Sequence, residues 1–290
     1  MDCVMAFTAL VLAATPAPHA TPLDTAAIER LTGAKGKLDR AANVFKVSAP
    51  RSDLAVTVGG VKLVPASGLT SWAAFEPDGA GVMVMGDLVL TEDQVNPVMS
   101  VALDNGLAVT ALHNHFLGES PRVMFMHVGG TGSLDPLAGA VGKVFARIKE
   151  PGTPLSTADI DPAATQLDVD RLASVLGHKG DLANGVYKVT VGRSAQMHGH
   201  AIGSTMGVNT WAAFAGTDAQ AVVDGDFAMT EAELQPVLKA LRAADLQIVS
   251  IHQHMTGEEP RIMFLHYWGV GRAEDLARGI RAALDKTQLK

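Results

Sequence analysis

The sequence predicts an α+β fold of two tandem homologous units, each a mostly antiparallel sheet with two helices in the order ββ(β)αββα. Three observations predict it: a long internal repeat, short apolar segments that alternate with amphipathic ones, and a Pro-rich stretch between the copies. We place the first repeat at residues 21–150, the linker at 151–163 and the second repeat at 164–290. A pseudo-two-fold axis is expected to relate the two units.

The repeat extends over most of each unit. Trp72 returns as Trp211, 139 positions later, and 24 of the 62 positions from Ser71 to Gly132 are identical without gaps. Identity of this extent over an ungapped segment indicates gene duplication, so the two units should share one fold.

The elements of the first unit follow from apolar periodicity and capping residues. Thr91 is predicted to cap a helix, because Glu92 and Asp93 follow it in the first turn, where the helix dipole favours acidic residues. In chain order we expect a short helix at 25–31, strands at 44–47, 72–75 and 82–90, the Thr91-capped helix, two strands joined by a turn, and a closing helix at 134–148.

The second unit repeats this order. Thr230 is the corresponding N-cap, and the helix after it carries four apolar residues on one face. These residues are Leu234, Val237, Leu238 and Leu241. The matching elements lie at 168–176, 186–191, 211–214, 221–229, 231–244 and 273–284, and the linker is recognised by its Pro, Thr, Ser and Asp content.

The composition excludes several classes of protein. The formal net charge is −7 and Lys and Arg form no cluster, which disfavours nucleic acid or an anionic membrane surface as a partner. No segment is long and apolar enough to span a bilayer. Cys3 is the only cysteine, so an intrachain disulfide and a Cys-built zinc site are excluded. The sequence does not predict the oligomeric state or the substrate.

The N-terminus resembles a secretory signal. An apolar run from Val4 to Ala14 precedes small residues, which predicts a signal peptide over residues 1–20 and export to the periplasm or beyond. Asp2 stands where a basic residue is expected, so a mis-set start or a disordered leader are the alternatives.

Two histidine-rich hairpins carry the chemistry. Each has an apolar run ending in His-x-His, then three residues, a Glu, Pro-Arg, and a second apolar run ending in His. Residues i and i+2 of a strand share a face, so a turn near Glu258 should set His252 opposite Phe264, with His266 diagonal to His252 and His254 opposite Ile262. Three imidazoles and one carboxylate that converge in this way favour a divalent cation.

The second unit offers the larger set of ligands. It adds His198 and His200, another same-face pair if extended, where the first unit has Gly59 and Val61. The predicted metal ligands are His198, His200, His252, His254, Glu258 and His266, with zinc preferred and copper, iron or manganese as alternatives.

The corresponding set in the first unit is a second, weaker prediction. It comprises His113, His115, Glu119 and His127. Three interpretations stay open for it: a degenerate site, a structural cluster, or a contribution to one site shared by the two units.

Other repeated residues have structural and functional interpretations. Asp87 and Asp226 are either turn residues or carboxylates that orient histidines. Arg122 and Arg261 could hold an anionic ligand, but pairing with Glu119, Glu258 or Glu259 is the preferred interpretation. The tryptophans Trp72 and Trp211 are expected in the core.

Two resemblances follow from these motifs. The His-x-His-x-x-x-Glu spacing is similar to the first metal motif of cupins, but the later cupin histidine is not evident. The wider pattern runs from Ser-Trp-x-x-Phe through Gly-Asp and Thr-Glu-x-x-x-x-Pro-Val to His-x-His and Pro-Arg-x-x-Phe-x-His. It resembles the LppY/LpqO family over nearly the whole chain past the leader. That resemblance implies an exported protein with a duplicated domain of unknown function, and it implies no reaction.

Three functions compete at this point. The first is a metal-dependent hydrolase, favoured over a redox metalloenzyme, in which Glu258 is a ligand or general base and Arg261 clamps substrate charge. The second is a non-enzymatic protein of the cell envelope that stores, delivers or senses metal. The third is a ligand-binding protein whose histidines are structural.

Overall fold

The fold is α+β, and its sheets are mostly antiparallel. The computed structural model describes residues 22–289. One 12-stranded sheet runs through both units in the order β1-β2-β5-β6-β9-β7-β16-β18-β15-β14-β11-β10, and two three-stranded sheets accompany it. Six α-helices are described, three in each unit. The first of each unit is the short helix expected at 25–31 and at 168–176, which the abbreviated order ββ(β)αββα leaves out. The predicted signal peptide, residues 1–20, lies outside the described residues.

The first unit contributes half of the large sheet. Its helices are α1 (Thr25–Thr32), α2 (Glu92–Asp104) and α3 (Leu134–Ile148). Its strands in the large sheet are β1 (Gly36–Asp39), β2 (Val44–Pro50), β5 (Thr70–Asp78), β6 (Gly81–Thr91), β7 (Ala108–His113) and β9 (Val123–Gly132). The small sheet is formed by β3 (Thr57–Val58), β4 (Val61–Lys62) and β8 (Glu119–Ser120).

The second unit repeats this set. Its helices are α4 (Val169–Leu176), α5 (Glu231–Ala243) and α6 (Ala273–Leu284). Its strands in the large sheet are β10 (Gly180–Ala183), β11 (Val186–Gly192), β14 (Asn209–Gly216), β15 (Ala221–Thr230), β16 (Gln247–His252) and β18 (Ile262–Gly271). The small sheet is formed by β12 (Ala195–Met197), β13 (His200–Ile202) and β17 (Glu258–Glu259).

Capping residues fix where the central helices begin. Thr91 and Thr230 are the N-caps, as predicted. The backbone N–H of Thr91 donates to Gln94 Oε1 at 3.2 Å, and that of Thr230 donates to Glu233 Oε2 at 2.7 Å. Each helix thus starts at the end of a long strand, with a side chain satisfying a backbone group that the helix leaves free.

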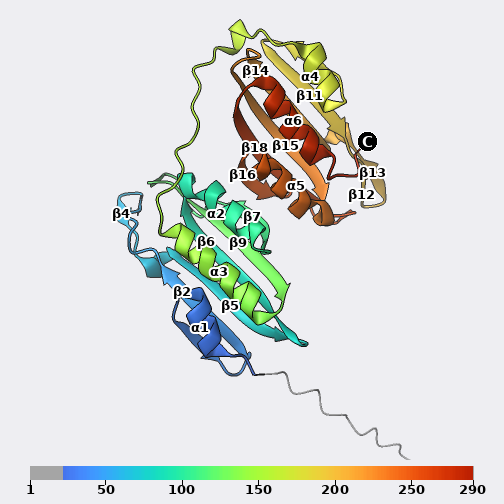
Figure 1. Cartoon of the computed structure of the whole chain (residues 1–290). Coiled ribbons are helices and arrows are strands. Elements are labelled where there is room, and N and C mark those ends of the chain that lie inside the picture. The colour runs from blue at the N-terminus through green and yellow to red at the C-terminus, as the bar shows by residue number, and fades with distance from the viewer. Residues whose placement is uncertain (1–21, 290) are drawn as a thin grey trace, which may run out of the picture.

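The two units join edge to edge at β7 and β16, where Leu112 is paired with Ile251. Helices of both units lie against one face of the joined sheet (Figure 1). Leu112 and Ile251 belong to the large core that these helices cover. Because neighbours along a strand alternate, the histidines that follow them point to the other face.

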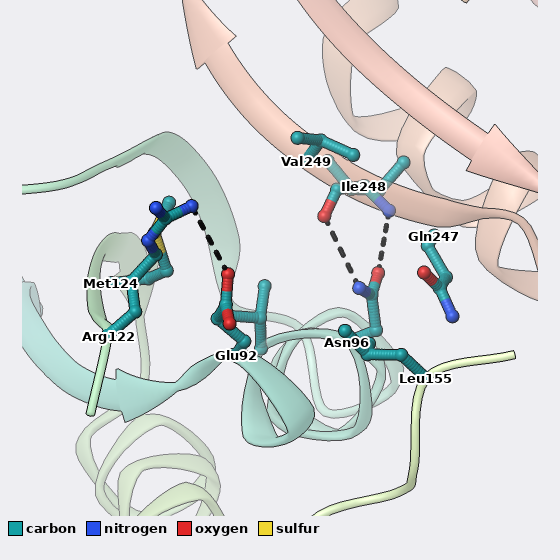
Figure 2. A pocket seen from close by; sticks show the side chains of 9 residues that line it. Glu92, Asn96, Arg122, Met124, Leu155, Gln247, Ile248 and Val249 are labelled. Atoms are coloured by element: carbon teal, nitrogen blue, oxygen red, sulfur yellow. Dashed lines mark hydrogen bonds and ion pairs between the residues drawn. The ribbon is translucent and has the colours of Figure 1, made fainter. Parts of the chain in front are cut away.

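Amide side chains complete the seam. β7 and β16 share only one described pair of residues, and beside the bulge of each strand a side chain from the other unit bonds its backbone. Asn96 accepts from the N–H of Ile248 at 2.7 Å and donates to its carbonyl at 3.3 Å (Figure 2). Gln235 makes the matching pair with Val109, at 2.9 and 2.8 Å.

The linker begins against α2. Pro97 has no N–H, so the carbonyl of Asp93 is left without its helical donor. The N–H of Thr153 donates to that carbonyl at 2.9 Å. The start of the linker is therefore fastened to the helix that precedes the seam. No helix in the described part of the chain is long and apolar enough to cross a membrane.

Candidate metal centre

The second-unit cluster is assembled from three adjacent strands. Asp226 on β15 is directly opposite His266 on β18, and His266 is opposite Ser250 on β16. His252 pairs with Phe264 and so lies diagonal to His266, as the hairpin pattern predicts. His254 follows the end of β16, where its ring stacks on Phe264 with centroids 3.5 Å apart.

Three potential ligands lie within reach of one ion. Asp226, His252 and His254 each present a ligand atom, and these atoms lie within 4.8 Å of one another. The Nε2 atoms of His252 and His254 are 3.1 Å apart, and His254 Nε2 is 3.6 Å from Asp226 Oδ2. Two nitrogens that share an ion at about 2.1 Å lie about 3.0–3.4 Å apart, so this spacing fits a common metal.

His266 lies beside this group. Its ring stacks on that of His252 with centroids 4.9 Å apart. Its Nδ1 lies 3.3 Å from the carbonyl oxygen of Gly225, to which an Nδ1–H can donate, leaving Nε2 as the free ligand atom. Gly225 is required here, because a Cβ would lie 2.1 Å from the Tyr267 ring.

The buried carboxylate is the chemically unusual member. Asp226 is 2 % exposed, and its Oδ1 has no hydrogen-bond partner among the described residues. Burial raises the pKa of Asp226 to about 6, against the attraction of His266 and backbone hydrogen bonds from Leu265 and Phe227. A buried carboxylate with a bare oxygen calls for a cation.

His252 and His254 are held neutral. Burial, and then the charges that His266 and His254 could carry, lower the pKa of His252 to about 4. Burial and His266 also lower the pKa of His254. At neutral pH the group therefore combines a carboxylate with unprotonated imidazoles, which is the state that binds a divalent cation.

The remaining predicted ligands are placed elsewhere. Glu258 is buried, and its Oε1 accepts the N–H of Ile262 at 2.9 Å, so it closes the turn, while its Oε2 has no hydrogen-bond partner among the described residues. The expected same-face pair at His198 and His200 does not form, because His198 has φ +52° and occupies the turn between β12 and β13. Both of these histidines are exposed, and no hydrogen bond or ring contact joins them to the cluster within residues 22–289.

The arginines pair with different acids from those expected. Arg261 Nε lies 3.8 Å from Glu231 Oε1, and Arg122 Nη1 lies 3.5 Å from Glu92 Oε1. Both acids begin the central helices rather than the hairpin turns, so the preferred pairing with Glu119, Glu258 or Glu259 is not found. All four side chains are about half exposed or more, which makes these contacts weak.

The first unit gathers the same residue types differently. His113 Nε2 faces His127 Nε2 at 3.1 Å, and His115 lies flat on Phe125 with centroids 3.3 Å apart. Glu119 is half-buried on β8, and one of its oxygens is buried without a partner in the described structure. Asp87 is opposite His127 in the sheet, as Asp226 is opposite His266.

Asp87 and Asp226 are the candidate site residues whose role the sequence left undecided. The sequence feature that pointed to them is the repeated Gly-Asp pair, which is typical of a turn and also of a carboxylate that orients a histidine. The structure puts both aspartates in the middle of long strands, which excludes the turn interpretation. The tryptophans paired with these aspartates, Trp72 and Trp211, are half-buried and not in the core, where they are expected from the sequence. Lys46 Nζ lies 3.9 Å from the Trp72 ring centroid, and Lys188 Nζ lies 4.2 Å from that of Trp211.

Five cavities in the described part of the chain lie apart from the histidines. Their volumes are about 110 to 360 Å³, and no histidine lines any of them. The one in Figure 2, about 190 Å³, lies at the seam between Glu92, Arg122 and Ile248. The second-unit cluster lies on a sheet face, where His252 is half-buried and His254 is exposed to solvent.

Comparison with known proteins identifies the family. A family model described as Domain of Unknown Function (DUF1259) matches the chain twice, over residues 26–147 and 170–286. The chain belongs to this family and carries its domain in two copies. No curated protein matches the chain, and no solved structure does.

Proposed function

We propose that this two-domain member of the DUF1259 family binds a divalent transition-metal ion at Asp226, His252 and His254. The observation that carries the proposal is the buried, unpartnered carboxylate beside two imidazole nitrogens 3.1 Å apart. His266 supplies a fourth donor from the adjacent strand. Neutral imidazole and carboxylate donors suit zinc best, and also iron, manganese or copper.

The reaction that this site supports best is metal-dependent hydrolysis. A bound zinc ion would act as a Lewis acid and lower the pKa of a water ligand. His252 is half-buried and His254 exposed, which leaves the outer side of the group open to water and substrate. Asp226 and Glu258 each keep one buried oxygen without a partner. We assign proton transfer to Asp226 because its carboxylate lies 3.6 Å from His254 Nε2, whereas Glu258 is directed to the Ile262 N–H in the turn.

Arg261 is a less suitable substrate clamp than its sequence position implies. Its guanidinium is directed to Glu231 at the start of α5. A substrate on the open face would instead meet the half-buried Trp211 ring, whose centroid is 6.5 Å from that of His266. An aromatic surface next to a metal favours a substrate with an apolar or sugar-like face.

A second candidate function is metal storage, delivery or sensing without catalysis. The specific observation that favours it is that no histidine lines any of the five cavities in the described structure. An exposed ion could then exchange with a partner. For either function we propose that the protein is exported, which is what the N-terminal sequence and the resemblance to the LppY/LpqO family support.

The test is metal analysis of untagged protein, followed by a screen of substrates. Wild type should carry stoichiometric metal, and a His252→Ala/His254→Ala variant with unchanged circular dichroism should lose the metal of this site. Wild type should then hydrolyse at least one ester, phosphoester or amide substrate, in a reaction stopped by chelation. Metal without any such activity would support the second candidate, and absence of metal would contradict both.

A further inference from the structure

One face of the large sheet carries both histidine clusters. Asp87, His127 and His113 come from β6, β9 and β7, and Asp226, His266 and His252 come from β15, β18 and β16. These six strands are consecutive in the sheet. Residues paired in register share a face, so the two sets lie on the face that the helices do not cover.

The first-unit set has the features of a ligand group. His113 Nδ1 lies 3.3 Å from the carbonyl oxygen of Asn114, which accepts an Nδ1–H and leaves Nε2 with a free lone pair. That Nε2 is 3.1 Å from His127 Nε2, the same spacing as between His252 and His254. The two nitrogens could therefore share one ion.

A buried carboxylate lies on the same face as this histidine pair. Asp87 is 9 % exposed, and its Oδ1 has no hydrogen-bond partner within the described residues. It is directly opposite His127 across the β6–β9 ladder, on the same face. Within residues 22–289 only Asp226, His252 and His254 bring three such ligand atoms within 4.8 Å of one another, so binding at the first-unit group requires the Asp87 carboxylate to turn towards the two nitrogens. Desolvating a carboxylate oxygen without a partner costs free energy that a bound cation would recover.

We propose that Asp87, His113 and His127 form a second binding site for a divalent transition-metal ion, so that the chain binds two ions. The proposal rests on the same chemistry as the proposed function but on different residues. His115, stacked on Phe125, stands at the edge of the group. Glu119 is left out of it, because its strand belongs to the small sheet.

The two ions would be separate. Three strand spacings lie between β9 and β18, which places the centres about 15 Å apart when each spacing is about 4.8 Å. A bridged pair of metals requires about 3.5–4 Å. The clusters are therefore two mononuclear sites on one open face, and not one site shared by the units.

The test is a metal titration of the whole chain with Zn²⁺, followed by calorimetry and by metal analysis after gel filtration. Wild type should bind two equivalents. Asp87→Asn/His127→Gln and its matched counterpart Asp226→Asn/His266→Gln should each bind one equivalent, with circular dichroism and melting temperature used to confirm folding. Two Cu²⁺ ions should also broaden each other's paramagnetic resonance spectra in wild type and in neither variant.

The outcomes separate the two proposals. One equivalent in wild type, lost only in the Asp226 variant, would overturn the first-unit site and leave the proposed function intact. One equivalent lost only in the Asp87 variant would support the first-unit site and contradict the proposed function. Binding of no ion by wild type would overturn both.

Discussion

The two units have the same order of helices and strands but differ in the ion pair at the start of the central helix. In the second unit Arg193 and Glu233 form a buried ion pair at 2.6 Å, and Glu233 also accepts from Thr230 and Gln288. In the first unit Gln94 takes the place of Glu233 on the central helix and accepts a hydrogen bond from Arg51. The ion pair of Arg51 is made with Asp53, which is exposed. One repeat has thus placed a charged pair where the other uses a neutral hydrogen bond.

The histidine clusters differ in the same direction. Asp224 lies two residues before Asp226 on β15, and its charge raises the pKa of the Asp226 carboxyl further. The residue that corresponds to Asp224 in the first unit is Met85. In the second unit His254 faces both His252 and Asp226, whereas in the first His113 faces His127. The added negative charge should make the second site the tighter of the two. Duplication kept the register and allowed the local charge to change.

The largest expected effect separates the two ion pairs. Arg193→Met should destabilise the protein by about 3–5 kcal/mol, because it leaves the buried Glu233 carboxylate without its partner. The matched Arg51→Met should cost about 1–2 kcal/mol, because Gln94 is neutral and Asp53 is exposed. Urea unfolding measures both, and equal losses would show that the two units do not differ in this respect.

The next effect concerns the metal-free second site. Asp226→Asn should stabilise the apo-protein at pH 8 by about 1–3 kcal/mol, since it removes a buried charge whose pKa is raised to about 6. Thermal unfolding in chelator measures this. A lower melting temperature for the variant at pH 8 would show that the carboxylate is satisfied in some other way.

The pH dependence of the same variant has a defined sign. The raised pKa of Asp226 gives stability that is present below about pH 4 and is lost as the pH rises through about 6. The lowered pKa of His252 gives stability that is present above about pH 6.5 and is lost as the pH falls towards 4. The two trends oppose each other in wild type. Apo Asp226→Asn should therefore gain stability between pH 4 and 7 more steeply than wild type, and parallel curves would contradict these assignments.

A symmetrical effect of similar size is expected at the seam. Asn96→Ala and Gln235→Ala should each cost about 1–3 kcal/mol, because each substitution leaves one backbone N–H and one backbone carbonyl without a hydrogen-bond partner. Similar losses in urea unfolding would confirm that the units hold each other equally. A loss confined to one variant would show that one unit depends on the other.

The smallest effect tests the arginine clamp. Arg261→Ala should change stability by no more than about 0.5 kcal/mol, because its ion pair with Glu231 is exposed and long. Metal affinity should not change. Isothermal titration with Zn²⁺ measures this affinity, with Arg122→Ala as the matched control in the first unit. A tenfold loss of affinity in Arg261→Ala would show that Arg261 takes part in the metal site.

Local patterns predicted the fold well. The helix expected at 134–148 is α3, the one expected at 273–284 is α6, and Thr91 and Thr230 are N-caps. Apolar periodicity and capping chemistry act within a few residues, which is why they can be read from a sequence. The small sheets were missed because their strands are only two or three residues long.

The site was predictable only in part. The pairing of His252 with Phe264 follows from the hairpin, so the position of His266 could be anticipated. Asp226 reaches the site from a strand that is sequentially distant from the hairpin, and nothing in the local pattern sets its register. The prediction that His198 lies in a strand was wrong, because His198 and Gly199 both have positive φ and form a turn.

The central claim is that Asp226, His252 and His254 bind one metal ion. A crystal structure of the zinc-loaded protein, with anomalous data collected at the zinc edge, tests it most directly. The account predicts an anomalous peak about 2.0–2.2 Å from the Nε2 atoms of both histidines and from an oxygen of Asp226. A fully loaded crystal whose zinc lies away from these atoms, with His252 and His254 joined only by a hydrogen bond, would contradict it.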